Sequence, residues 1–169
     1  MTNTSTTAPA AALATGWLSR ILRLWHGLQV VLDGLQPAAA LMARAYVAEV
    51  FFKSGLTKLR DWDITLALFQ DEYKVPLLSP DVAAVMGTGG ELVLPVLLLL
   101  GLGGRLGALG LSVMNVVAVV SLVDIAPAAL QQHITWGVLL AGVAVFGNGR
   151  WSLDNWLLSR WPALDSRLR

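Results

Sequence analysis

The sequence predicts an all-α membrane protein, an antiparallel bundle of four transmembrane helices preceded by an N-terminal amphipathic interfacial helix. The first observation behind this prediction is composition. Of the 169 residues, 56% are hydrophobic and only 14% are charged, whereas soluble domains carry about 25% charged residues. The second is that four apolar segments each approach the roughly 20 residues a helix needs to cross the hydrocarbon core. The third is an uneven distribution of Lys and Arg between the connecting segments.

Composition also excludes several classes of function. The chain has no cysteine, so disulfides, thiolate metal sites and dithiol redox chemistry by the protein itself are ruled out. The formal net charge is +1, and the basic residues are scattered instead of forming a basic patch. We therefore expect no nucleic-acid partner.

The N-terminal region is predicted to have two parts. Residues 1–14 lack a basic segment and a long apolar run, and we expect a disordered leader there. Residues 15–36 form an amphipathic pattern, with apolar side chains on one half of a helical wheel and Arg20, Arg23, His26 and Asp33 on the other. Such a helix either lies in the membrane interface or packs against protein, and the sequence leaves both alternatives open.

Residues 37–157 are predicted to be the transmembrane domain, and residues 158–169 a cytoplasmic tail. The four spans are expected at about Ala38–Leu59, Pro80–Leu102, Leu106–Val123 and Ala128–Phe146. Pro37 suits a helix start. A short interfacial helix is expected in the loop between the first two spans, where apolar residues alternate with polar ones.

Charge predicts the topology of these spans. Arg20, Arg23, Arg105 and the arginines of the C-terminal tail would lie on one side, and the acidic loop of residues 60–81 on the other. Because cytoplasmic segments are enriched in Lys and Arg, we expect both termini in the cytoplasm and the acidic loop outside. An even number of spans agrees with this arrangement.

Polar residues at membrane depth are the candidate site. An ionised side chain at the bilayer centre costs roughly 2.5–3.5 kcal/mol on insertion scales, so we expect these residues to turn inward. Glu49 and Lys53 have the spacing of a helical ion pair, and Lys58 is close enough to the outer boundary to snorkel. The sequence leaves open whether the resulting polar seam is a functional pocket or a structural network. Its members are Arg44, Glu49, Lys53, Glu91, Arg105 and Asn115.

A second group of residues is expected near the outer mouth of the bundle: His133, Trp136 and Asp124. His133 and Asp124 do not have a recognisable metal-ligand spacing, and we predict no metal site. No nucleophile motif accompanies His133. We therefore assign no catalytic residue.

Several short motifs together resemble the DoxX family of small bacterial membrane proteins, over about Leu41–Leu157. The first is an Arg, here Arg44, followed by Ser-Gly-x-x-Lys-Leu, here "SGLTKL" from Ser54 to Leu59. Glu91 matches a glutamate of the second helix, and Gly101-Leu102 with Arg105 match the following turn. A closing motif, "GNGRWSLD", spans residues 147–154. The motif residues carried over are Ser54, Gly55, Lys58, Gly149, Ser152 and Asp154.

The resemblance implies a bacterial inner-membrane protein that works with partner subunits. We expect an accessory or anchor subunit of a redox-linked membrane complex rather than a stand-alone enzyme. A quinone or another small hydrophobic ligand, bound in the bundle, is the cofactor the resemblance suggests. One alternative is a non-enzymatic structural subunit that packs against a larger membrane assembly. Another is a carrier or exporter of a small solute.

Overall fold

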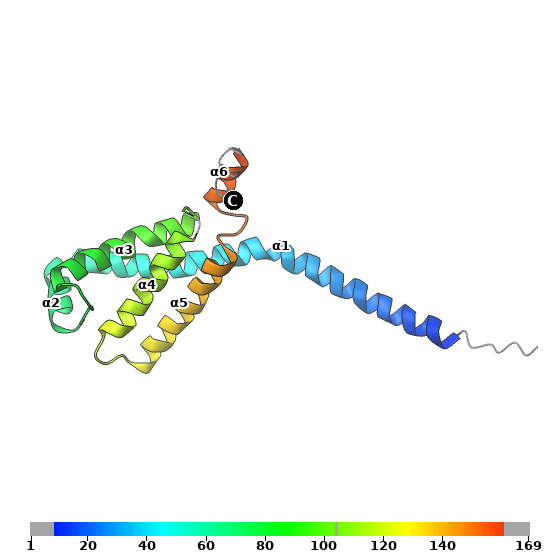
Figure 1. Cartoon of the computed structure of the whole chain (residues 1–169), viewed down its shortest axis with the longest axis horizontal. Helices are drawn as coiled ribbons and strands as arrows, with labels where there is room; N and C mark the ends of the chain where they lie inside the picture. The colour runs from blue at the N-terminus through cyan, green and yellow to red at the C-terminus, as the bar shows by residue number, and fades with distance from the viewer. Residues whose placement is uncertain (1–8, 104, 161–169) are drawn as a thin grey trace, which may run out of the picture. The chain divides into compact units, whose positions relative to one another are not determined.

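The described part of the chain is helical, which confirms the all-α prediction. The computed structural model describes residues 9–103 and 105–160, with side chains from Gly16 onward. These residues form six helices (Figure 1): α1 Pro9–Arg60, α2 Trp62–Asp71, α3 Pro80–Leu100, α4 Leu106–Ser121, α5 Pro127–Phe146 and α6 Leu153–Arg160. Within those ranges the sole β-type pairing is an isolated antiparallel bridge between Tyr73 and Leu122.

The first helix differs from its prediction. It runs continuously for 52 residues with Pro37 inside it, so the expected helix start at Pro37 is wrong. A proline removes one backbone donor, but good helix formers on both sides, including Ala38–Ala40, continue the helix. The helix also includes residues 9–14, which were predicted to be disordered. The rest of the predicted leader, residues 1–8, lies outside the described residues, as do residues 161–169 of the predicted tail.

The chain divides into two compact units, residues 1–36 and 37–169. In the first unit, every side chain that the structure describes, from Gly16 to Gln36, is exposed. The second unit contains the remainder of α1 and all the other helices. Two of these, α3 and α5, are long and apolar enough to span a membrane, and α4 is a shorter apolar helix. Their bounds lie close to those predicted for the second, third and fourth spans.

Local sequence accounts for where these helices begin and end. Proline stands at the start of α3 and of α5, where its missing N–H group costs nothing. The short α2 is the predicted helix of the acidic loop, and the Asp61 side chain caps it by accepting from the Ile64 amide at 3.0 Å. At the other end of α3, Gly101 has φ +65°, the left-handed conformation that favours glycine at a helix C-cap.

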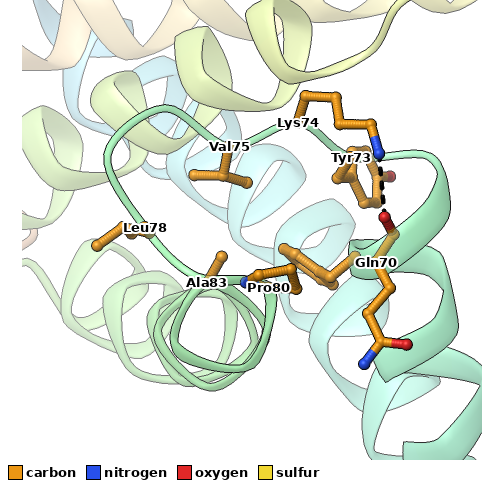
Figure 2. Close-up of a pocket in the computed structure, with 8 residues that line it drawn as sticks. Gln70, Tyr73, Lys74, Val75, Leu78, Pro80 and Ala83 are labelled. Atoms are coloured by element: carbon orange, nitrogen blue, oxygen red, sulfur yellow. Dashed lines mark hydrogen bonds between the residues drawn. The ribbon is translucent and has the colours of Figure 1, made fainter.

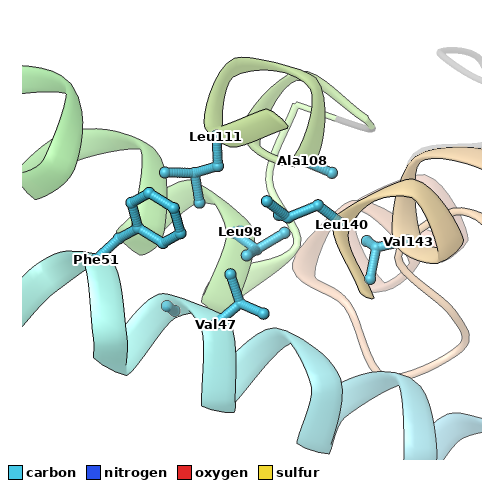
Figure 3. Packing of buried hydrophobic residues seen from close by; sticks show 8 residues of the cluster. Val47, Phe51, Leu98, Ala108, Leu111, Leu140 and Val143 are labelled. Carbon is cyan, nitrogen blue, oxygen red and sulfur yellow. The ribbon is translucent and has the colours of Figure 1, made fainter. Parts of the chain in front are cut away.

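One apolar core joins four helical segments of the second unit (Figure 3). It consists of buried side chains from α1, α3, α4 and α5: Val47, Ala48, Phe51, Leu98, Ala108, Leu111, Leu140 and Val143. Packing these side chains together removes apolar area from contact with the surroundings and fills the space between the helices. The core therefore fixes one face of α1, including Val47 and Phe51, against the helical hairpins that follow.

The ends of this bundle are tied by backbone hydrogen bonds. At one end, called the α2 end, the Lys74 amide donates to the Ser121 carbonyl at 2.8 Å, beside the Tyr73–Leu122 bridge. At the other, called the α6 end, the Asp154 amide donates to the Gly101 carbonyl at 3.2 Å. In Figure 1, α3, α4 and α5 run alternately between these ends.

Candidate functional site

A partly buried ion pair connects α1 to α3 within the bundle. Lys58 Nζ lies 2.6 and 2.8 Å from the two carboxylate oxygens of Glu91 and 2.9 Å from Ser54 Oγ. The Lys58 and Glu91 side chains are 13% and 14% exposed. Gly55 permits this approach, because a Cβ there would stand 3.0 Å from the Leu92 side chain and 3.1 Å from Glu91 Cβ. Ser54, Gly55 and Lys58 of the first motif therefore all contribute to the contact between α1 and Glu91.

Residues from the acidic loop complete the surroundings of this pair. Thr65 Oγ1, which is buried, donates to the Lys58 carbonyl at 2.8 Å. Burial raises the pKa of Tyr73, and the nearby carboxylates of Glu91 and Glu72 raise it further. The Tyr73 phenol is therefore neutral and part of the same electrostatic environment as Glu91. Sequence reasoning missed both Thr65 and Tyr73, because the loop that carries them gave no signal of where it folds back.

A second polar cluster lies at the α6 end around Arg44. This side chain is completely buried, and its guanidinium donates to the carbonyl of Leu99, at 3.3 Å, and to that of Trp151. The carbonyls at a helix C-terminus are unsatisfied and carry partial negative charge. Arg44 thus binds the last turn of α3 and the segment before α6. Its Nε is buried and has no partner within the part of the chain that the structure describes.

The motif residues at the chain's other end belong to the same cluster. Ser152 Cβ would lie 2.6 Å from a Cβ added at Gly101, so the segment before α6 packs directly on the left-handed turn. Asp154 Oδ1 accepts from the Gly103 amide at 3.1 Å. Gly149 has φ +75° and stands against Ala40 of α1. The closing motif therefore holds the turn after α3.

A third cluster joins α4 to α5. Asn115 Nδ2 donates to the His133 carbonyl at 2.9 Å, so Asn115 Oδ1 is the acceptor for His133 Nδ1 at 2.8 Å. The imidazole meets the edge of Trp136, with ring centroids 4.9 Å apart, and Trp136 meets Phe51 at 5.9 Å. Asn115 is 5% exposed. This reciprocal pairing orients the histidine ring and places Trp136 against the core.

Glu49 and Lys53 form the ion pair that their spacing predicted, at 2.6 Å, but they do not face inward. Their side chains are 60% and 71% exposed, respectively. The expectation that they turn into the bundle is wrong, because Val47, Ala48 and Phe51 occupy the inward face of α1. The pair instead lies on the opposite face.

The remaining predicted residues are also separate from the bundle interior. Arg105 is exposed at the start of α4, and Asp124 is exposed in the α4–α5 connection. The single polar seam is thus replaced by three separate polar clusters between helices and one exposed pair. Among the described residues, no group of three or more His, Asp or Glu side chains could hold a metal ion.

A cavity of about 230 Å³ lies at the α2 end (Figure 2). Its lining combines aromatic, aliphatic and polar side chains: Phe69, Gln70, Tyr73, Lys74, Val75, Leu78, Pro80 and Ala83. Lys74 Nζ donates to the Gln70 carbonyl at 3.0 Å. None of the predicted site residues lines this cavity, because it is formed where the loop after α2 folds over the start of α3.

Two helices, α3 and α5, are long and apolar enough to cross a membrane, as in a helical membrane protein. The family comparison agrees with this class. The DoxX family model matches residues 39–124, about half of the chain, and the chain belongs to the DoxX family. No curated protein and no solved structure matches it.

Proposed function

We propose that this DoxX-family chain is an accessory subunit that is anchored in the bacterial inner membrane and packs there against other protein. In this proposal the second half of α1 crosses the bilayer together with α3, α4 and α5. Arg105, Arg150 and Arg160 belong to the α6 end, and the acidic residues around α2 belong to the opposite end. The excess of basic residues favours a cytoplasmic α6 end and cytoplasmic termini.

The observation that carries the proposal is the exposed Glu49–Lys53 pair. On α1 it lies between Arg44, which reaches Leu99 at the end of α3, and Lys58, which reaches Glu91 within α3. Since α3 spans the membrane in this proposal, the pair would stand at the depth of the hydrocarbon. Charged side chains at this depth are costly when they face lipid, and they normally face protein or a water-filled cavity. A protein surface over this face of α1 would remove that cost.

The polar clusters favour a supporting role over a catalytic one. Lys58 pairs with Glu91, Arg44 with backbone carbonyls, and Asn115 with His133. Each contact joins one helix to another segment of the bundle. Networks of this kind fix the relative positions of helices. The redox character of the partner complex rests on the family resemblance alone.

Photo-crosslinking in native membranes tests the proposal. A photoreactive amino acid at Met42, which is on the exposed face of α1, should form adducts with protein. The same group at Val113, which is on α4 and 64% exposed, serves as the matched control and should react chiefly with lipid. Adducts with lipid alone at both positions would overturn the proposal.

A small hydrophobic ligand such as a quinone is a second candidate, and the cavity at the α2 end favours it. Phe69 and Tyr73 could stack against a ring, while Lys74 and Gln70 provide polar groups at the same wall. A volume of about 230 Å³ lies below the roughly 300–1,000 Å³ of typical ligand pockets, so only a ring-sized headgroup fits. Equilibrium binding of a short-chain quinone should be weakened by Ala83→Leu, which fills the cavity. It should be unchanged by Ala126→Leu, at an exposed position.

A further inference from the structure

The short helix α6 has two different faces. Leu153, Trp156 and Arg160 recur at intervals of three and four, and all three are exposed. Leu157 and Leu158 lie on another face of the helix and are only partly exposed. Trp156, and also Trp151 just before the helix, are more than half exposed. This segment therefore presents two aromatic side chains that the bundle does not cover.

The charges of the segment are separated in the same way. Asp154, the one acidic residue of α6, is partly buried, and its carboxylate accepts from the Gly103 amide in the turn after α3 at 3.1 Å. Arg150 and Arg160, in contrast, are exposed, and neither forms an ion pair within the described ranges of the chain. The exposed side of the segment is therefore aromatic and positively charged. Its residues Arg150, Trp151, Leu153, Trp156 and Arg160 are together called the α6 surface.

Contacts with the bundle hold the α6 surface in place. Arg44 donates to the Trp151 carbonyl, and the Asp154 amide donates to the Gly101 carbonyl at 3.2 Å. On the surface itself, the guanidinium carbon of Arg160 lies 5.5 Å from the centre of the Trp156 ring, which is a cation–π contact. This contact uses no N–H···O hydrogen bond, so the guanidinium of Arg160 can still bind an anion.

We propose that the α6 surface binds the headgroups of anionic phospholipids. The inference rests on the proposed function, which places the α6 end at the cytoplasmic face of the membrane. Tryptophan is enriched at headgroup depth, because its ring is apolar and its N–H group is polar. Arginine binds phosphate through paired hydrogen bonds, and an anionic leaflet attracts basic residues that lie near its surface. The α6 surface offers both kinds of side chain on one exposed segment.

Charge complementarity favours this occupant at the α6 end alone. Arg105 at the start of α4 is exposed as well, so three exposed arginines accompany the single carboxylate of Asp154. At the α2 end, acidic residues outnumber basic ones within residues 60–81. Anionic headgroups are therefore attracted to the α6 end and repelled from the α2 end.

Fluorescence quenching by brominated lipids tests the proposal with the full chain in vesicles. Two sets of phosphatidylcholine vesicles contain the same fraction of either brominated phosphatidylglycerol, which is anionic, or brominated phosphatidylcholine, which is zwitterionic. The emission of Trp156 is obtained as the difference between the unaltered chain and Trp156→Phe. We expect the anionic lipid to quench Trp156 more strongly, and high salt to reduce this preference. Equal quenching by the two lipids, or quenching by neither, would overturn the proposal.

Arg160 and Arg60 provide a matched pair of variants, because each is exposed and is the last residue of its helix. Arg160→Gln should lower the relative affinity for the anionic lipid at Trp156 by roughly fivefold, the effect of one basic residue near an anionic membrane surface. Arg160→Lys keeps the charge and should retain most of the preference. Arg60→Gln, at the α2 end, should leave it unchanged. A loss with Arg60→Gln as large as that with Arg160→Gln would overturn the proposal.

Failure of this inference can be distinguished from failure of the proposed function. In native membranes, crosslinks from a photoreactive amino acid at Trp156 to protein instead of lipid would overturn the lipid site and leave the accessory-subunit proposal standing. Lipid adducts alone from Met42, together with an anionic preference at Trp156, would overturn the accessory-subunit proposal and support the lipid site.

Discussion

Lys58 of α1 and Glu91 of α3 form a partly buried ion pair, with Nζ 2.6 Å from the nearer carboxylate oxygen. The contact depends on Gly55, which brings the two backbones close enough for a lysine to fold back onto Glu91. It also lies in the electrostatic field that reaches Tyr73 in the loop after α2. One pairing thus positions α1, α3 and the α2 end relative to one another.

Removing one partner of this pair should be strongly destabilising. Glu91→Ala leaves the Lys58 ammonium buried without its carboxylate, and such losses cost roughly 3–5 kcal/mol. The double variant Lys58→Met/Glu91→Leu removes both charges and should recover most of the loss. Tryptophan fluorescence during denaturation in detergent would measure the free energy of unfolding. Glu49→Ala, at the exposed pair, is the matched control and should change it little in the single chain.

Arg44 should control how firmly the C-terminal segment is held. Arg44→Lys keeps the charge but lacks the planar fork that reaches the carbonyls of Leu99 and Trp151 together. Hydrogen bonds to charged groups contribute about 1.5–3 kcal/mol each, so residues 147–160 should exchange amide hydrogens faster. Hydrogen exchange with mass spectrometry would detect the change. Arg150→Lys, at an exposed position, should leave exchange unaltered, and equal effects of both changes would contradict the assigned role.

Alanine substitution at two glycines, one within α3 and one at its C-cap, should change the stability of the protein in opposite directions. Gly101 has φ +65°, and a Cβ there would meet the Arg44 guanidinium and Ser152. Gly101→Ala should therefore destabilise the protein by at least the roughly 1–2 kcal/mol of a left-handed residue. Gly89 lies within α3 and a Cβ there meets nothing within 4 Å, so Gly89→Ala should stabilise by about 0.5–1 kcal/mol. Thermal unfolding in detergent measures both changes, and a loss at Gly89 as large as that at Gly101 would refute the explanation.

Tyr73 should ionise above its ordinary pKa of 10.0, because burial and the carboxylates of Glu91 and Glu72 oppose the phenolate. Since the folded-state pKa lies above the unfolded one, this stability contribution is complete below about pH 10 and is lost as pH rises through the folded-state value. Absorbance at the phenolate band, compared between Tyr73→Phe and Tyr46→Phe, isolates the titration of the chain's two tyrosines. Glu91→Gln should bring the pKa down. A Tyr73 midpoint at or below the ordinary value would refute the burial of its hydroxyl.

Local patterns in the sequence predicted much of the fold. Apolar length, together with proline at the starts of α3 and α5, located those helices closely, because each signal lies within the segment it describes. The four-residue spacing of Glu49 and Lys53 on one helix likewise predicted their ion pair. Pro37 was misleading, since a proline favours a helix start but does not prevent a helix from continuing on both sides.

The partners of the polar residues could not be predicted in the same way. Lys58 was expected to extend to the membrane boundary, but the small size of Gly55 brings Glu91 within its reach. Arg44 was expected in one polar seam with Glu49 and Glu91, but it donates to carbonyls of Leu99 and Trp151. Both contacts depend on which helices lie side by side, and the order of residues along the chain does not specify this.

The bond from Arg44 to the Trp151 carbonyl also imposes an order of assembly. The two residues are 107 positions apart, so Arg44 leaves the ribosome long before its acceptor has been synthesised. The first helix of the bundle cannot reach its final environment until the chain has been translated past Trp151. A chain truncated before Trp151 would lack this acceptor, and quality-control proteases could recognise the Arg44 side chain left without it.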